Sequence, residues 1–253
     1  LVNYCHERHI ILVPELDVPG HCEAFRKAFS LDSMSDPRVQ PILLELLDEL
    51  CDLVPIEKMP YIHLGTDEVW NKNERPVPGL LSALSSRIRQ RQREVIVWRP
   101  GQHIENDSTS ITQLWSSQGK PKPGHRYIDS RLNYLNHLDP LAGVPQLYFD
   151  RICGAAHGDS LRLGGTLCCW NDNNVAEPGD ILRQNPVYPG MLTYAESAWK
   201  GSVTDTGENF LAKFPSPKDN SCQEFRDFEE RLIAHRDLYF AGKPFPYVRQ
   251  SAI

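Results

Sequence analysis

Two adjacent carboxylates, Asp67 and Glu68, are the residues whose type and setting best suit acid–base chemistry. They follow the apolar run at residues 61–64 and a glycine at position 65. Successive side chains of a strand point to opposite faces, so both carboxylates can serve one site only where the chain leaves the strand, and Gly65 permits such an exit. Strand ends in α/β folds commonly display reacting groups. The competing interpretation is an exposed turn with two solvated acids.

The composition predicts a single globular domain. The chain has 253 residues, and α/β barrels of this length form one domain. A formal net charge of −6 and a single basic cluster at residues 87–93 give no electrostatic footprint for nucleic acid. No apolar run approaches the roughly 18 to 20 residues of a membrane helix, so we expect no membrane span and a soluble chain.

The seven cysteines cannot all pair within the chain, and none has the spacing of a zinc ribbon or a redox CxxC motif. We therefore expect mostly free or buried thiols, which leaves the cellular compartment open. The chain begins at Leu1, without a methionine, in a segment that resembles a helix. We expect the natural N-terminus to lie upstream.

The apolar pattern predicts alternating strands and helices. Helical spacing predicts a helix from Pro41 to Leu53, capped by Asp36 or Ser35, and another at residues 80–92. A terminal helix is predicted with Phe225, Phe228, Leu232, His235 and Tyr239 inward and with Glu229, Glu230 and Arg231 outward. Six segments predict strands: residues 9–14, 61–64, 94–98, 110–115, 126–130 and 165–170.

This order predicts an α/β fold with a parallel sheet. A closed (β/α)8 TIM-barrel-like fold needs two more strands, which would lie before Leu1, so strands 3 to 8 would be present here. Residues 1–253 would form one partial barrel domain, with a C-terminal tail and closing helix at 202–253. An open barrel exposes strand edges, so an upstream segment or a partner chain would have to complete it.

Two loops resemble those of glycoside hydrolase family 20, the β-N-acetylhexosaminidases. Residues 14–21, Pro-Glu-Leu-Asp-Val-Pro-Gly-His, resemble the family's PE-x-D-x-PGH loop after barrel strand 3. Residues 63–69, His-Leu-Gly-Thr-Asp-Glu-Val, resemble its H-x-GGDE motif after strand 4, with Thr66 in place of the second glycine. The resemblance extends from about Leu1 to Trp199 and implies a TIM-barrel glycosidase.

The resemblance also implies how the sugar is bound. Trp98, Trp115 and Trp170 stand where the family places aromatic walls around the terminal sugar, and Tyr134 stands where it places the tyrosine that holds the N-acetyl carbonyl. Asn136 and Asp172 replace an aspartate and a glutamate that grip sugar hydroxyls. The preference between N-acetylglucosamine, N-acetylgalactosamine and a 6-substituted sugar is therefore left open.

The chemistry follows from the spacing of the two acids. Ordinary glycosidases need carboxyl groups about 5 to 9.5 Å apart on opposite sides of the bond, an arrangement that suits neighbouring residues poorly. The family solution uses the substrate's own 2-acetamido oxygen as nucleophile. Glu68 would then be the general acid/base, with a pKa raised by burial and by the charge of Asp67, and Asp67 would accept the amide N–H.

Three further side chains are assigned supporting roles. His21 is a candidate substrate-binding residue or a buried group that hydrogen-bonds the acidic loop. Asp17 and His63 would support the catalytic residues from behind, although Asp17 is as readily a loop-forming residue. His21 has no metal-ligand partners at usable sequence spacing, so neither a metal nor another cofactor is predicted.

Two alternatives remain open. A glycan-binding protein on a degenerate hexosaminidase scaffold would bind the sugar without turnover. A divalent-metal hydrolase or lyase built on Asp17, His21, Asp67 and Glu68 would lose activity with chelators. For the hydrolase, the expected partners are terminal β-N-acetylhexosaminides of glycans or glycoconjugates, and the resemblance implies a periplasmic, extracellular or lysosomal location.

Overall fold

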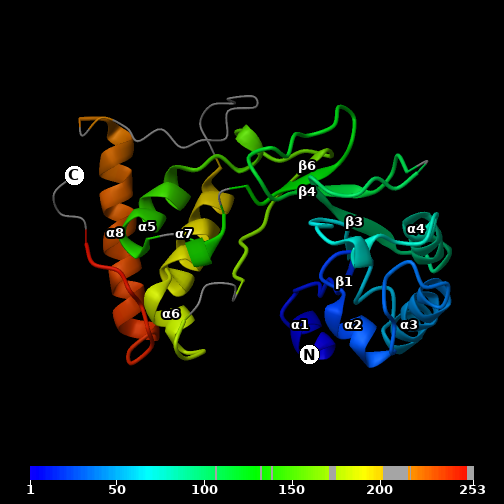
Figure 1. Ribbon diagram of the computed structural model, residues 1–253. Helices are drawn as coiled ribbons and strands as arrows, with labels where there is room; N and C mark the ends of the chain where they lie inside the picture. The colour runs from blue at the N-terminus through cyan, green and yellow to red at the C-terminus, as the bar shows by residue number, and fades with distance from the viewer. Residues whose placement is uncertain are drawn as a thin grey trace. The chain divides into compact units, whose positions relative to one another are not determined.

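The computed structural model describes residues 1–105, 107–131, 133–137, 139–170, 175–201, 216 and 218–249. These residues form two compact units, Leu1–Tyr127 and Ile128–Ile253, which we describe separately. The described residues contain six strands in the hydrogen-bonded order β1-β2-β3-β4-β5-β6, and β1 to β4 pair in parallel (Figure 1). The predicted α/β fold with a parallel sheet is therefore confirmed.

The first unit alternates strands with helices. Its strands are β1 (Glu15–Val18), β2 (Tyr61–Gly65), β3 (Glu94–Arg99) and β4 (Ile111–Leu114). Its helices are α1 (Val2–His6), α2 (Glu23–Ala28), α3 (Val39–Leu53) and α4 (Leu80–Gln90), with a 3-10 turn η1 (Lys72–Glu74). In Figure 1, α3 lies beside α4, and α4 packs against β3.

Strand register brings the chain segments that follow β1, β2 and β3 to one edge of the sheet. Val18 lies opposite Gly65, and His63 lies between Glu15 of β1 and Ile96 of β3. Because the strands are parallel, their carboxyl ends share this edge. The loops after all three strands, at residues 19–22, 66–69 and 100–103, are therefore positioned to form one site.

Burial of the helix faces holds this sheet in place. Leu43 and Leu47 of α3 and Leu84 of α4 are at most 1% exposed. They belong to one hydrophobic cluster with Ile62 and Leu64 of β2, whose side chains are also fully buried. Ile62 and Leu64 share one face of β2, and His63 on the other face is 4% exposed, so both faces are covered, as expected for a strand inside a parallel α/β sheet.

A buried arginine joins the end of α3 to the start of β3. The Arg93 side chain is 5% exposed. Its guanidinium donates to the carbonyl oxygens of Cys51 (3.1 Å), Val54 (2.6 Å), Met59 (3.1 Å) and Arg91 (3.0 Å). The last carbonyls of a helix have no partners within the helix, and Arg93 supplies donors at this end of α3.

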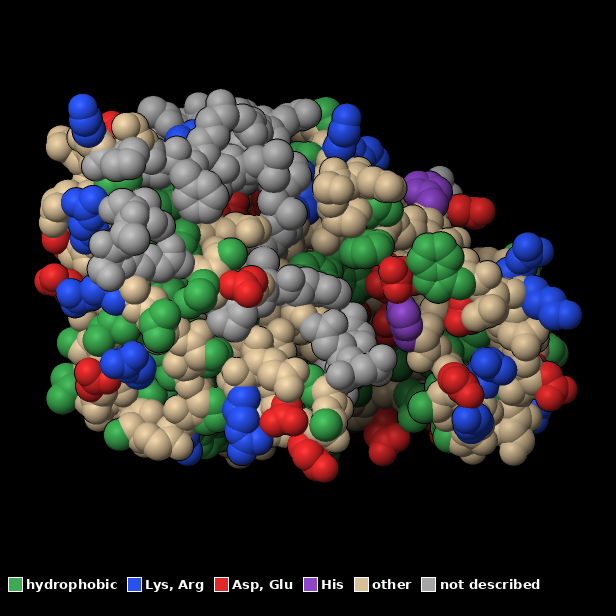
Figure 2. All heavy atoms as spheres, turned by 60° about the vertical axis from the view of Figure 1, so that its left-hand side comes forward, with side chains coloured by type: hydrophobic (Ala, Val, Ile, Leu, Met, Phe, Trp, Pro, Cys, Tyr) green, Lys and Arg blue, Asp and Glu red, His purple; other side chains and the backbone are tan. Residues whose placement is uncertain are grey.

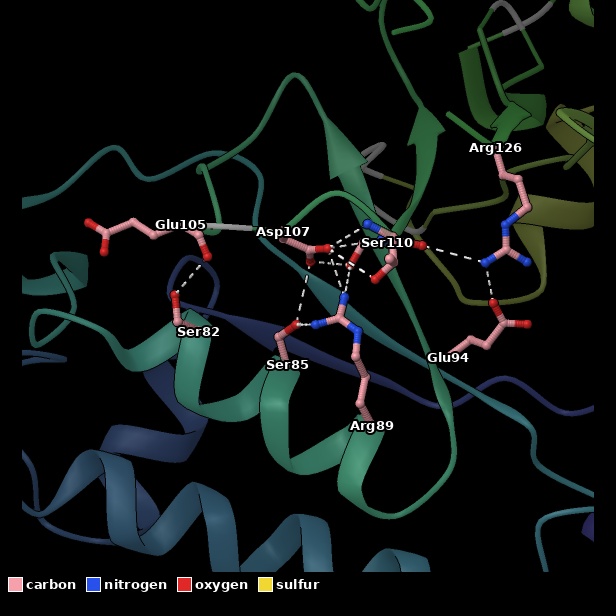
Figure 3. A network of polar contacts seen from close by, with 9 residues as sticks. Ser82, Ser85, Arg89, Glu94, Glu105, Asp107, Ser110 and Arg126 are labelled. Atoms are coloured by element: carbon pink, nitrogen blue, oxygen red, sulfur yellow. Dashed lines mark hydrogen bonds and ion pairs between the residues drawn. The ribbon is translucent and has the colours of Figure 1, made fainter. Parts of the chain in front are cut away.

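A second polar network fixes the segment before β4 (Figure 3). Asp107 accepts hydrogen bonds from Arg89 of α4 (2.8 Å) and from the backbone N–H groups of Thr109 and Ser110 (3.0 Å each). Burial acts to raise the pKa of Asp107, but the hydrogen bonds from Ser110 and Arg89 outweigh it and hold that pKa well below its usual range. The network therefore connects the loop before β4 to helix α4, which carries Arg89.

Two sequence predictions in this unit are wrong. Residues 9–14 do not form the predicted strand; β1 lies just after them, and Ile10 and Ile11 are more than half exposed. Pro14 still accepts a hydrogen bond from the backbone N–H of His63 (2.9 Å), so pairing with β2 starts there. The predicted helix cap is also absent, because Asp36 accepts from the backbone N–H of Arg38 before α3 begins.

The second unit is mainly helical. Its strands are β5 (Tyr127–Asp129), which begins at the boundary, and β6 (Arg162–Gly165). Its helices are α5 (Pro140–Phe149), α6 (Asp180–Gln184), α7 (Val187–Lys200) and α8 (Asn220–Tyr239), with 3-10 turns η2 (Leu135–His137) and η3 (Ile152–Gly154). Helix α7 contacts both α5 and α8 (Figure 1), with Val144, Phe225 and Phe228 in a shared core.

The terminal helix and the last strand differ from their predictions. Phe225, Phe228 and Leu232 are buried as expected, and His235 and Tyr239 are exposed. Glu229 was expected to face outward but is 2% exposed, because its carboxylate accepts a hydrogen bond from the Tyr247 hydroxyl. The strand predicted at 165–170 lies earlier, as β6, and only Cys168 makes an isolated bridge with Tyr134.

The remaining composition-based predictions concern thiols, membranes and charge. All seven cysteines are free, and Cys169 is the exposed one. Within the described part of the chain, no helix combines the length and apolar character needed to cross a bilayer. The face shown in Figure 2 carries acidic and basic side chains interspersed.

Candidate active site

The chain leaves β2 through a series of left-handed backbone conformations. Gly65, Thr66 and Glu68 have φ angles of 65°, 82° and 39°. The Gly65 N–H donates to Nδ1 of His63 (2.9 Å), which closes the first turn. This path lets Asp67 and Glu68 leave the alternation of the strand, as the sequence predicted.

Thr66 occupies a conformation that β-branched residues rarely adopt. Its side chain is fully buried, and its hydroxyl donates to the carbonyl oxygen of Trp98 (3.3 Å). A Cβ on Gly101 would lie 2.9 Å from both Thr66 oxygens, so the missing side chain at 101 makes room for Thr66. The replacement of the family's second glycine by threonine is therefore accommodated by the β3 loop.

Four titratable side chains gather where these loops meet. His21, after β1, places Nε2 3.9 Å from Oδ2 of Asp67 and 3.5 Å from Oε2 of Glu68. The Asp67 side chain is 15% exposed and that of Glu68 is 32% exposed. One Oδ1 atom each of Asp17 and Asp67 is fully buried without an N–H or O–H donor from the described residues. The alternative of a solvated acidic turn does not describe this arrangement.

Burial and mutual repulsion change the protonation of this cluster. Burial, followed by the negative charges of Asp67 and Glu15, raises the pKa of Asp17 to about 8. Burial also raises the pKa of Asp67. At neutral pH Asp17 therefore carries a proton, and its carboxyl group can donate that proton to Asp67 in a hydrogen bond. This hydrogen bond acts to lower the pKa of Asp67, against the effect of burial.

The rings of His63 and Trp98 pack against each other next to the cluster. Their rings lie 4.8 Å apart, and the Trp98 indole N–H donates to Oε1 of Glu15 (2.7 Å). Burial lowers the pKa of His63 to about 3, so the ring is neutral and its 3.4 Å approach to Glu15 is not an ion pair. Burial raises the pKa of Glu15, although the hydrogen bond from Trp98 opposes this shift. The supporting role of His63 stays a prediction.

A cavity of about 400 Å³ opens beside Glu68. Trp115 forms one wall, and its indole N–H donates to the carbonyl oxygen of Pro100 (2.7 Å), which fixes the orientation of the ring. The full lining consists of Glu68, Trp70, Pro100, Gly101, Gln102, Trp115, Ser116, Ser117 and Gln118. Its volume lies within the roughly 300 to 1,000 Å³ typical of small-molecule sites.

The same loops group three side chains that could act as metal ligands. One donor atom each of Asp17, His21 and Asp67 lies within 4.8 Å of the others, although sequence spacing gave His21 no such partners. Zinc holds nitrogen and oxygen ligands at about 2.0 to 2.2 Å, so all three atoms would have to lie at that distance from one ion. A metal would also have to displace the proton that Asp17 holds at neutral pH.

The second unit contains the other predicted residues. Tyr134 and Cys168 form a parallel bridge, and the carboxamide oxygen of Asn136 accepts from the backbone N–H of Trp170 (3.2 Å). Asn136 is 1% exposed, whereas Trp170 is 43% exposed. Asp172 lies outside the described residues. The structure thus groups Tyr134, Asn136 and Trp170 in this unit, and Asp17, His21, His63, Asp67, Glu68, Trp98 and Trp115 in the other.

Three residues near the carboxylates had no assigned role in the sequence. Glu15 accepts the hydrogen bond from Trp98, Thr66 contacts the end of β3, and Trp70 lines the cavity. Glu15 lies within the first motif segment and Trp70 directly follows the second, so their positions were visible in the sequence. Their contacts depend on the pairing of β1, β2 and β3, which the motifs alone do not give.

Replacing Asp17 by Asn should flatten the pH dependence of stability. Asp17 loses its proton near pH 3.8 in the unfolded chain but only near pH 8 in the folded chain. Between these values the unfolded state binds fewer protons, so the free energy of unfolding of the wild type falls as pH rises. Urea denaturation from pH 5 to 8 should give a shallower slope for Asp17→Asn. Asp32→Asn, at an exposed position, is the control, and equal slopes for Asp17→Asn and wild type would contradict the assigned proton.

Comparisons with known proteins agree with the sequence motifs. No family model matches the chain. β-Hexosaminidase 3 of Arabidopsis thaliana is 25% identical over an alignment 290 positions long, which covers 100% of this chain and 52% of that protein. The β-N-acetylhexosaminidase of Cellulomonas fimi is 25% identical over 264 residues, 92% of this chain and 50% of that protein. The chain therefore spans about half the length of these curated relatives.

A solved structure shows the same fold. The chitobiase of Flavobacterium johnsoniae, from glycoside hydrolase family 20, superposes with a TM-score of 0.65 and 22% identity, over 92% of this chain and 40% of that one. The matches to hexosaminidase sequences and to this fold confirm the resemblance that the two loop motifs predicted. The chain is thus similar in sequence to β-hexosaminidases and in fold to a family 20 glycoside hydrolase, and its six-stranded sheet corresponds to part of a TIM barrel.

Proposed function

We propose that this chain contributes the catalytic acids of a retaining exo-β-N-acetylhexosaminidase that works by substrate-assisted catalysis. The substrates would be glycans that end in β-linked N-acetylglucosamine or N-acetylgalactosamine. The names of the relatives from Arabidopsis thaliana and Cellulomonas fimi support the substrate class. The observation that carries the proposal is the cluster after β2, in which Asp67 and Glu68 both approach His21 and Asp17 carries a proton.

This cluster suits one proton donor and one amide-binding carboxylate. A glycosidase with a protein nucleophile needs two carboxylates on opposite sides of the sugar. Here Asp67 and Glu68 are consecutive residues, and the same imidazole lies within 4 Å of both. Asp17 holds a proton at neutral pH. Without this proton, two carboxylate anions would lie beside each other, at Asp17 and at Asp67. Asp67 is then an acceptor for the N–H of a 2-acetamido group.

In the first step, Glu68 donates its proton to the glycosidic oxygen while the acetamido oxygen attacks the anomeric carbon. The bond to the leaving group breaks, and an oxazolinium ion forms, stabilised by Asp67. In the second step, Glu68 takes a proton from water as that water attacks the anomeric carbon, and the acetamido group is restored. Two inversions give net retention, and Glu68 ends protonated as it began.

The remaining assignments stay predictions that rest on the family resemblance. Tyr134 would orient the acetamido carbonyl, and Trp98, Trp115 and Trp170 would surround the sugar. Asn136 and Asp172 would contribute to recognition of the hydroxyl groups. The competing glycan-binding function predicts affinity for N-acetylglucosamine without any turnover.

Substrate-assisted catalysis predicts that removal of the acetamido group abolishes turnover. The full-length protein should hydrolyse methyl β-N-acetylglucosaminide at least about 100-fold faster than methyl β-glucoside, because an oriented internal nucleophile supplies much of the rate. An oxazoline-mimicking thiazoline should inhibit competitively, and proton NMR should show the β-anomer as first product. Similar rates for both glycosides, or an α-anomer, would contradict the mechanism. Loss of activity with EDTA would instead favour the metal-dependent alternative.

A further inference from the structure

A second cavity lies in the second unit, between the turn η3, the end of β6 and the end of α7. Its volume is about 170 Å³. Tyr134, Asn136 and Trp170 are not among the described residues that line it, so the cavity is separate from these three predicted sugar contacts. The polar and aromatic side chains of its lining include those of Asp150, Arg151, His157, Ser197 and Trp199.

Two charged side chains of this lining have spare hydrogen-bonding capacity. The Arg151 guanidinium is half-buried and has no acceptor within the described part of the chain. Oδ1 of Asp150 accepts from the backbone N–H of Arg151 (2.8 Å), and no described side chain pairs with this carboxyl, because Arg131 pairs with Asp129 instead (2.8 Å). Burial raises the pKa of Asp150 to about 7, so both its protonated and its ionised forms are present at neutral pH. Together the two side chains can donate and accept hydrogen bonds.

A buried hydroxyl adjoins the same cavity. Tyr194 is 8% exposed, and its hydroxyl has no hydrogen-bond partner among the described residues. A Cβ on Gly165, which lines the cavity, would overlap this hydroxyl. The glycine therefore leaves the hydroxyl at the cavity wall. Because buried polar groups are nearly always hydrogen-bonded, an unpartnered hydroxyl at this wall independently points to a polar ligand.

An exposed indole lies at the rim of the cavity. Trp199 lines the cavity and is 93% exposed, so most of its ring faces solvent. The end of α7 that carries it is anchored, since the Ser197 hydroxyl donates to the carbonyl oxygen of Leu147 in α5 (2.8 Å). The backbone N–H of Gly201 donates to the carbonyl oxygen of Ser197 (3.0 Å) and ends the helix. A large apolar ring held at the edge of a polar cavity is typical of a binding surface.

The charges of the lining favour a neutral ligand that carries hydroxyl groups. An anion in this cavity would meet the ionised form of Asp150, and a cation would meet Arg151. A hydroxyl group avoids both conflicts, because its oxygen can accept from the guanidinium while its hydrogen is donated to the carboxylate. A sugar ring combines such hydroxyls with an apolar C–H face, which suits the indole of Trp199.

We propose that this cavity is an accessory site for a single pyranose ring, held by hydrogen bonds to Asp150 and Arg151 and stacked on Trp199. The volume of about 170 Å³ is below the roughly 300 to 1,000 Å³ of sites for larger molecules, which limits the bound part to one ring. This proposal goes beyond the proposed function and does not depend on it, because none of the three residues belongs to the cluster after β2. The ligand class is a free monosaccharide or one sugar of a glycan.

Fluorine NMR of the full-length protein labelled with 5-fluorotryptophan tests this site directly. The Trp199 signal is identified by its loss in Trp199→Phe. N-acetylglucosamine should shift this signal saturably, with a Kd on the order of 1 mM. Arg151→Met and Asp150→Asn should each raise this Kd by at least about 10-fold, because each removes a hydrogen bond to a charged group. Arg183→Met is the matched control, since Arg183 lies outside the lining and pairs with Asp180.

The other tryptophan signals separate this site from the proposed catalytic pocket. Trp98 and Trp115, identified in the same way, report that pocket, and the Trp199 shift should persist when the thiazoline inhibitor is present at saturation. If N-acetylglucosamine moves only the Trp98 and Trp115 signals, the accessory site is overturned and the proposed function is unaffected. An equal Kd for wild type and Arg151→Met, or no Trp199 shift at about 50 mM sugar, also overturns the site. A Trp199 shift with glycine but not with the sugar would replace the pyranose by a zwitterionic ligand.

Discussion

Glu68→Gln should lower kcat/KM for an alkyl β-N-acetylglucosaminide by at least about 100-fold, because a positioned general acid contributes roughly 100- to 10,000-fold. Glutamine keeps the size of the side chain and removes the proton that the leaving alcohol needs. The loss should be smaller for a dinitrophenyl glycoside, whose leaving group departs without protonation. Initial rates on both substrates, measured with the full-length protein, give the two losses.

Comparison of variants separates proton donation from general damage to the site. Asp67→Asn should reduce the rates on both substrates by similar factors, since it weakens the intermediate and not the departure of the leaving group. Glu57→Gln, at an exposed position, should leave both rates unchanged. Activity of Glu68→Gln within about threefold of wild type on the alkyl glycoside would remove Glu68 as the acid.

Gly65→Ala should strongly destabilise the first unit and abolish activity. Gly65 has φ 65°, and a Cβ there would overlap Oδ1 of Asp17 and lie 2.8 Å from the Cα of Asp17. The left-handed conformation costs a non-glycine residue about 1 to 2 kcal/mol. Overpacking typically adds about 1 to 3 kcal/mol, because β1 and β2 must move apart. Urea denaturation followed by far-UV circular dichroism measures the sum.

The chain supplies a matched control for the backbone part of this loss. Gly79 also has positive φ, at 77°, and no heavy atom of the described residues lies within 4 Å of the position that an alanine methyl would take there. Gly79→Ala should therefore cost only about 1 to 2 kcal/mol, the backbone contribution. Equal losses for the two variants would show that Asp17 does not approach Gly65 as closely as the structure indicates.

The sequence predicted the elements in which an apolar pattern coincides with burial. The apolar spacing of α3 and the continuous apolar run of β2 correspond to faces that are buried between helices and sheet. In β1 the pattern misled, because the apolar residues before it are exposed and the strand itself carries Glu15 and Asp17. The position of β1 is set by backbone pairing with His63, which side-chain hydrophobicity does not encode.

The candidate site was predictable as two motifs but not as a network. The loop that carries Asp17 and His21 and the pair Asp67–Glu68 were both identified as functional segments. The proton on Asp17 depends on its burial beside Asp67 and Glu15, three groups brought together only by strand register. The exposure of Trp70 was not predicted either, since nothing in the local sequence pattern distinguishes an exposed tryptophan from a buried one.

Arg93 connects the end of α3 to the start of β3 through hydrogen bonds that acid should leave intact. Its four acceptors are backbone carbonyl oxygens, which do not take up protons in the acid range, and arginine stays charged throughout it. The Arg89–Asp107 pair, in contrast, disappears once its carboxylate is neutralised. Strongly acidic solution would therefore loosen the loop before β4 while the end of α3 stays attached to the start of β3.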